Sequence, residues 1–140
     1  MSRIRTAYRN YRKGIIDIMI QFFKQLSLFS FFGLMITLIC WITLGEHSTD
    51  YPVAAWLIIA LTPLLFPLRG LLHGKPYTHA WTGFLMLFYF SHGIGEVYSA
   101  QVFDIYASLE VLFSCMTFSA SIVFIRLNAN ALKGSQNNEA

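Results

Sequence analysis

The side chains best able to do chemistry in this 140-residue chain stand at helical spacing within its last two apolar segments. One stripe consists of Thr78, Thr82, Tyr89, His92 and Glu96. A second stripe, farther along the chain, consists of Glu110, Ser114, Thr117 and Ser121. Residues at intervals of three, four and seven share one face of an α-helix. An imidazole, two carboxylates and several hydroxyls on such faces could bind a proton or a small ligand, or could hold two helices together.

An antiparallel hairpin that turns near Phe103 would bring these two stripes face to face. The level pairs predicted by the spacing are Glu96 with Glu110, His92 with Ser114, and Tyr89 with Thr117. We therefore predict one polar cluster made of these six residues. Two interpretations remain open: a charged site for a proton or ligand, or a set of hydrogen bonds that fixes the hairpin register.

Other chemistry has little support in the sequence. It contains no glycine-rich phosphate loop, no GxSxG, no HExxH and no CxxC pair. Only His92 lies deep in an apolar segment, so haem ligation by two histidines of one chain is not expected. The two cysteines, Cys40 and Cys115, lie at different depths in apolar segments and are expected to act as small hydrophobic residues. We expect no enzyme activity, cofactor or metal.

The elements that must position these residues are membrane-spanning helices. Hydrophobic residues make up 56% of the chain and charged residues 12%, whereas a soluble domain is about 25% charged. The apolar residues form four blocks, each near the roughly 20 residues that cross a ~30 Å hydrocarbon layer. The blocks cover residues 26–44, 51–68, 79–96 and 105–125. The sequence thus predicts an all-α membrane protein with a four-helix transmembrane domain over residues 26–127.

The orientation follows from the basic residues, which all lie in the N-terminal arm, the second connection or the C-terminal tail. They are Arg3, Arg5, Arg9, Arg12, Lys13, Lys24, Arg69, Lys75, Arg126 and Lys133. The first and third connections contain none. The positive-inside rule therefore predicts that both termini are cytoplasmic and that the polar cluster lies toward the outer side.

The ends of the chain carry separate predictions. Residues 1–25 form a basic, amphipathic arm that either lies on anionic lipid or is an early start of the first span. Arg69, Lys75 and the neighbouring His73 and His79 either contact lipid headgroups or only determine topology. Residues 128–140 are polar and are expected to be disordered. The basic residues form no stripe within a soluble module, so nucleic acid is not an expected partner.

The middle of the chain resembles a known family. The segments that carry the resemblance are PLRGLLHGKPYTHAWTGFLMLFYFSHGIGE at Pro67–Glu96 and LEVLFS at Leu109–Ser114. Matching positions include Pro67, Gly70, Gly74, Tyr77, Thr78, Ala80, Trp81, Phe84, Leu85, Tyr89, Phe90, His92, Gly93, Glu96 and Leu109–Leu112. The resemblance covers about residues 50–127. The chain resembles a family of small predicted inner-membrane proteins of proteobacteria, which share a domain of unknown function. The resemblance implies a four-span protein of the bacterial inner membrane and implies no activity.

Three functions remain open at this point. The short loops and the lack of a catalytic set favour a non-enzymatic accessory protein that binds a membrane-protein partner or a second copy of itself. The alternative is a small oligomeric transporter or ion-conducting protein that uses His92, Glu96 and Glu110. A membrane enzyme acting on a lipid or a quinone is the third.

Overall fold

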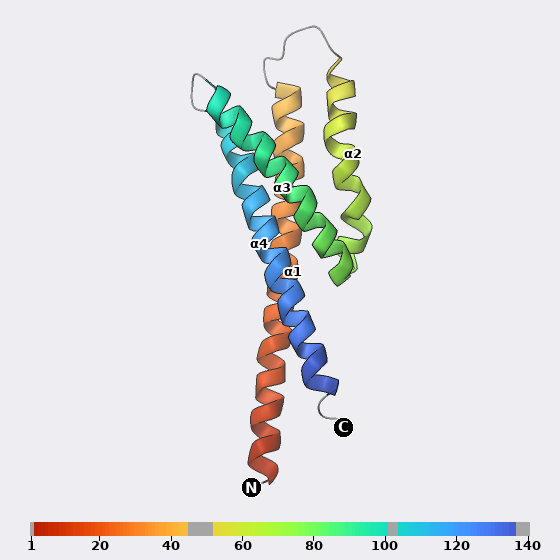
Figure 1. Ribbon diagram of the computed structural model, residues 1–140, viewed down its shortest axis with the longest axis vertical. Helices are drawn as coiled ribbons and strands as arrows, with labels where there is room; N and C mark the ends of the chain where they lie inside the picture. Colours follow the sequence, from red (N-terminus) through yellow and green to blue (C-terminus); the bar gives the residue numbers. More distant parts are fainter. Residues whose placement is uncertain (1, 45–51, 101–103, 137–140) are drawn as a thin grey trace.

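The computed structural model describes residues 2–44, 52–100 and 104–136, and all of the regular structure in them is helical (Figure 1). The four helices are α1 (Ser2–Leu44), α2 (Val53–Leu72), α3 (Pro76–Ser99) and α4 (Ile105–Gln136). The predicted all-α class is confirmed. The predicted turn at Phe103, the start of the second span at Tyr51 and the last four residues of the tail lie outside the described residues.

Three of the helices, α1, α2 and α4, are long and apolar enough to cross a membrane. The 24 residues of α3 would extend ~36 Å at ~1.5 Å per residue, which is also sufficient length. Its polar stripe lowers its mean hydropathy, so α3 is absent from this group. Composition alone therefore supports three of the four predicted spans.

Helix α1 is much longer than the predicted first span. Its 43 residues continue through Gly14 without a break and correspond to ~65 Å, about twice the thickness of a hydrocarbon layer. Its first half projects past the turn between α2 and α3 (Figure 1). An arm lying along the membrane surface would need a bend near residue 25, and α1 is continuous there. The structure thus agrees with the reading in which the first helix starts early.

Helix α4 is also longer than expected, because it continues to Gln136. The prediction of a disordered tail is therefore wrong for residues 128–136. Leu127 and Ala131 are partly buried and line the same groove as Arg12 and Ile16 of α1, so packing against α1 supports these added turns. We call residues 2–24 of α1 and 127–136 of α4 the stalk.

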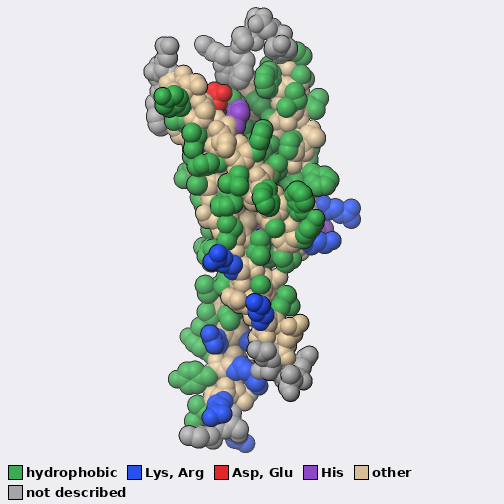
Figure 2. All heavy atoms as spheres, viewed as in Figure 1, with side chains coloured by type: hydrophobic (Ala, Val, Ile, Leu, Met, Phe, Trp, Pro, Cys, Tyr) green, Lys and Arg blue, Asp and Glu red, His purple; other side chains and the backbone are tan. Residues whose placement is uncertain are grey.

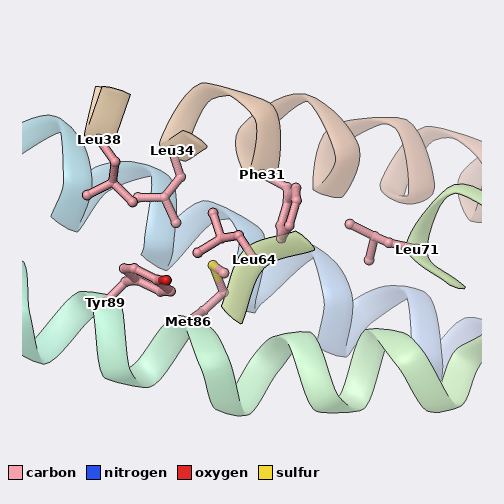
Figure 3. Close-up of a cluster of buried hydrophobic side chains, with 7 residues drawn as sticks. All are labelled: Phe31, Leu34, Leu38, Leu64, Leu71, Met86 and Tyr89. Carbon is pink, nitrogen blue, oxygen red and sulfur yellow. The ribbon is translucent and has the colours of Figure 1, made fainter. Parts of the chain in front are cut away.

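Helix α4 packs extensively against α1 and α3, whereas α2 contacts α1 and α3 over a smaller area. The apolar core lies among the helices and comprises Phe31, Leu34, Leu38, Leu64, Leu71, Met86 and Tyr89 (Figure 3). Two glycines hold α2 against α3. Gly74 has a φ of 65° in the connecting turn, which suits glycine. A Cβ on Gly70 would lie 2.2 Å from Thr78 Oγ1, so only glycine permits this approach.

Candidate functional site

The central contact of the site joins α3 to α4. Nδ1 of His92 lies 3.1 Å from Oε1 and 3.3 Å from Oε2 of Glu110. The Glu110 side chain is only 2% exposed, while that of His92 is 40% exposed. A carboxylate removed from water needs such a hydrogen-bonding partner, because an unpaired buried charge is very costly. The pair forms a hydrogen bond with a neutral imidazole and an ion pair with a protonated one.

Gly93 allows the helices to meet at this level. A Cβ at Gly93 would lie 3.0 Å from Cγ2 of Val111 and 3.3 Å from Cγ of Glu110. The backbone of α3 therefore approaches α4 at the position where Glu110 needs a partner. The small residue next to His92 therefore permits the close contact between α3 and α4.

The predicted register of the hairpin is wrong by about one helical turn. Glu110 faces His92, and not Glu96 as the spacing suggested. The observed register is physically favoured because it gives a buried carboxylate a donor, whereas the predicted one would place two carboxylates together. The two polar stripes do meet at the His92–Glu110 contact. At the other end of the hairpin Ser121 of the second stripe lies 3.4 Å from Nδ1 of His79, which is not a member of the first stripe.

The partner of Tyr89 also differs from the prediction, because this residue contacts α2 and not Thr117 of α4. Its hydroxyl donates a hydrogen bond of 2.5 Å to the carbonyl oxygen of Ala60, and the residue is 4% exposed. It does not pair with Thr117. This bond joins α2 to α3 at the level of the cavity.

A cavity of about 370 Å³ opens beside the His92–Glu110 pair and is bordered by all four helices. Its aromatic walls and polar end are formed by Trp41, Trp56, Phe88, Tyr89, His92, Glu96 and Glu110. The rings of Trp41 and His92 meet edge to face with centroids 5.7 Å apart. Glu96 therefore borders the same cavity as the His92–Glu110 pair. Figure 2 shows acidic and histidine side chains side by side near this end of the molecule, far from the stalk.

A second polar layer, deeper in the bundle, was not predicted. Thr117 Oγ1 donates to Ser30 Oγ at 2.9 Å, and the hydroxyls of Ser27 and Ser121 are 3.0 Å apart. All four residues are fully buried. Thr117 therefore faces α1, and Ser121 contacts both α1 and α3. The signal in the sequence was the spacing of three between Ser27 and Ser30, which puts both serines on one face of α1.

His79 is the clearest correction at the level of a single residue. The sequence places it near the inner surface with Arg69, His73 and Lys75, but it is fully buried and the centroid of its ring lies 4.3 Å from that of Phe124. Its Nε2 has no hydrogen-bond partner among the described residues, and the same holds for Ser114 Oγ. Arg69, His73 and Lys75 remain exposed at the turn.

One family model matches this chain. It is described as "Predicted membrane protein (DUF2069)" and matches residues 26–129. The chain belongs to the DUF2069 family. The resemblance carried by Pro67–Glu96 is thereby confirmed. Searches of curated proteins and of solved structures return no significant match.

The DUF2069 match includes every residue of the cavity and of both polar layers, whereas residues 2–24 of the stalk precede it. Among the residues that the structure describes, no three histidine, cysteine or acidic side chains group together as metal ligands do. The contact between His92 and Glu110 suits exchange of a proton, and the aromatic walls of the DUF2069 cavity suit binding of a small ligand.

Proposed function

We propose that this DUF2069 protein crosses the bacterial inner membrane four times, with both termini in the cytoplasm. The distribution of its polar side chains supports α3 as the fourth span. His79, Thr82 and Tyr89 are buried inside the bundle, while Trp81 and Phe84 are 56% and 72% exposed on the outer face of α3. A helix with its polar face buried against neighbours and its apolar face outward is suited to lipid.

The charges support the same orientation. Lys and Arg side chains gather on the stalk and at the level of the α2–α3 turn, and the opposite end of the described surface shows none (Figure 2). In this orientation Arg69 and Lys75 lie at the inner surface and contact anionic headgroups. Arg3, Arg5, Arg9, Arg12 and Lys13 stand farther from the membrane on the stalk. Arg5 is ~30 Å along α1 from Lys24 at ~1.5 Å per residue, which exceeds the ~8 Å screening length of physiological salt.

Within this topology the protein acts as a non-enzymatic accessory protein that binds another membrane component. The observation that carries this proposal is the stalk, because two helices project beyond the bundle and expose a large apolar and basic surface. Exposed apolar surface outside lipid marks a binding site for another protein. The sequence contains none of the catalytic motifs named above that would favour an enzyme instead.

The proposal is tested by purifying the full chain from native membranes in mild detergent after brief chemical crosslinking. We expect a second membrane protein in fixed stoichiometry or a defined homo-oligomer. A protein that is monomeric both before and after solubilisation, with no crosslinked species, would contradict an accessory role.

The cavity favours a second candidate function, which is a small oligomeric transporter or ion-conducting protein. Two carboxylates and an imidazole border a space of about 370 Å³ at one end of the spanning helices. In the proposed topology this end faces the outside. Proton or ligand flux in proteoliposomes that is abolished by Glu110→Gln, a variant that retains the shape of the side chain, would support transport over an accessory role.

A further inference from the structure

One side of the stalk carries a regular row of exposed, large apolar side chains on α1. The six residues and their exposed fractions are Ile4 64%, Tyr8 76%, Tyr11 73%, Ile15 42%, Ile18 71% and Phe22 61%. We call this row the seam. Figure 2 shows hydrophobic side chains along one edge of the stalk.

The spacing of the seam is that of a coiled coil. Its members follow one another at intervals of four, three, four, three and four residues. This is an unbroken alternation of the a and d positions of a heptad repeat, with Tyr8, Ile15 and Phe22 at a. Ordinary amphipathic helices have a wider and less regular apolar face. The pattern predicts a partner that is itself a helix running alongside α1.

Helix α4 is not that partner, because it packs on another face of α1. The groove between the two stalk helices is lined by Arg12, Ile16 and Asp17 from α1 and by Leu127 and Ala131 from α4. At ~100° per residue, Ile16 lies roughly 120° around α1 from the middle of the seam. The seam is thus left open after the chain has packed against itself.

We propose that the seam pairs with the seam of a second copy of this chain to form a parallel, two-stranded coiled coil. This inference deepens the proposed accessory function and rests on the topology proposed with it. Two copies inserted in one membrane with the same orientation have their stalks parallel and at the same height. The membrane therefore sets the direction and register that a parallel coiled coil needs, and it raises the effective concentration of the two stalks.

The area of the seam is sufficient for such a dimer. The six exposed side chains together present the equivalent of about four whole side chains, or ~800 Å² at ~200 Å² each. Stable protein interfaces bury ~800 Å² on each partner.

The charges of the stalk are compatible with this pairing. Arg12 stands at an e position and would face Ala7 of the second copy at position g, so this pair has no like charges in contact. Arg9 and Lys13 stand at b and f, away from the seam. The long stem of Arg12 can cover the edge of the apolar row while its charge stays in water.

The seam cannot lie on the membrane surface while α1 keeps its observed form. From Phe22 to Ile4 the helix extends ~27 Å at ~1.5 Å per residue, continuous with the half that enters the bundle. A second helix alongside it is the occupant that this geometry accepts.

Cysteine crosslinking in native membranes tests the proposal. In the full chain carrying Cys40→Ala and Cys115→Ala, Tyr11→Cys and Ile18→Cys place a thiol at two d positions, and Asn10→Cys is the matched control on another exposed face. Mild oxidation should convert the two d-position variants to a species of twice 16.0 kDa and leave the control monomeric. No dimer at positions 11 and 18, or equal yields at position 10, would overturn the proposal.

A second variant separates pairing from chance collision. Ile18→Glu, added to Tyr11→Cys, should lower the yield of the disulfide about tenfold, since a charge at a core position disfavours the coiled coil. An unchanged yield would contradict the seam as the interface.

Protection of a monomeric Ile18→Cys variant from a water-soluble maleimide in anionic but not in neutral vesicles would instead assign the seam to lipid. The accessory function is judged separately, by the partner found on purification, so a missing dimer and a missing partner are distinct results.

Discussion

His92 of α3 and Glu110 of α4 are 3.1 Å apart at closest approach, and this contact fixes how the two helices pass each other. The acid is almost completely buried and the imidazole is partly exposed toward the cavity. Glu110 can therefore hold the two helices together, while His92 is accessible from the cavity. Substitutions at these positions separate the two roles.

We expect Glu110→Gln to retain most of the stability of the bundle, because its amide oxygen still accepts a hydrogen bond from His92. Glu110→Ala should lower the free energy of unfolding by about 2–3 kcal/mol, since it removes a charge-assisted hydrogen bond and leaves a void. Thermal unfolding in detergent measures both variants. Equal losses for the two substitutions would show that the charge of Glu110, rather than its hydrogen bond, holds the helices.

Gly70→Ala should be among the most damaging small substitutions in the chain. Its Cβ would lie 2.2 Å from Thr78 Oγ1, so α2 and α3 must separate, and overpacking of this kind costs about 1–3 kcal/mol.

Gly83→Ala is the matched control for this change, because its Cβ would be 3.7 Å from Phe118, an ordinary contact. That variant should be neutral or slightly stabilising, since alanine favours helix by up to ~1 kcal/mol over glycine. If both alanines lower the melting temperature equally, the close approach at Gly70 is not what holds the turn.

Tyr89→Phe should loosen α2 with little effect on the rest of the bundle. The substitution removes the hydrogen bond to the carbonyl oxygen of Ala60 and costs about 1 kcal/mol. Hydrogen exchange followed by mass spectrometry should show faster exchange in α2 and unchanged exchange in α4. Faster exchange spread evenly over all four helices would mean that Tyr89 supports the whole core.

The helices and the polar faces could be predicted from the sequence because they depend on local pattern. Block lengths and the spacing of His92, Glu96 and Glu110 are read along the chain, and the helical class and the family resemblance followed from them.

The register could not be predicted, because it depends on a close approach between helices at Gly93 and on which donor reaches Glu110. Burial of His79 escaped prediction for a similar reason. Its place near a cluster of basic residues indicated the surface, but packing against Phe124 places it inside.

The continuation of α4 past Leu127 could not be predicted, because Leu127 and Ala131 are partly buried in a groove beside α1 that no local pattern shows. Residues 128–136 are polar and, taken alone, have too few apolar side chains to specify a helix. Contact along the groove between the two stalk helices supplies what the local sequence lacks. The seam on α1 could not be predicted from composition, because arginines stand among its apolar residues and only their spacing distinguishes it.

The topology is the central claim of the account, because the position of the stalk, the outer cavity and the parallel seams all depend on it. The most direct measurement labels single cysteines with a membrane-impermeant maleimide, using Ser99→Cys at the end of α3 and Ser135→Cys near the end of α4 in a chain without native cysteines. The topology with both termini in the cytoplasm predicts that Ser99→Cys is labelled in intact spheroplasts and that Ser135→Cys is labelled only after the membrane is opened. Labelling of Ser135→Cys in intact spheroplasts, or of Ser99→Cys only in opened ones, would contradict it.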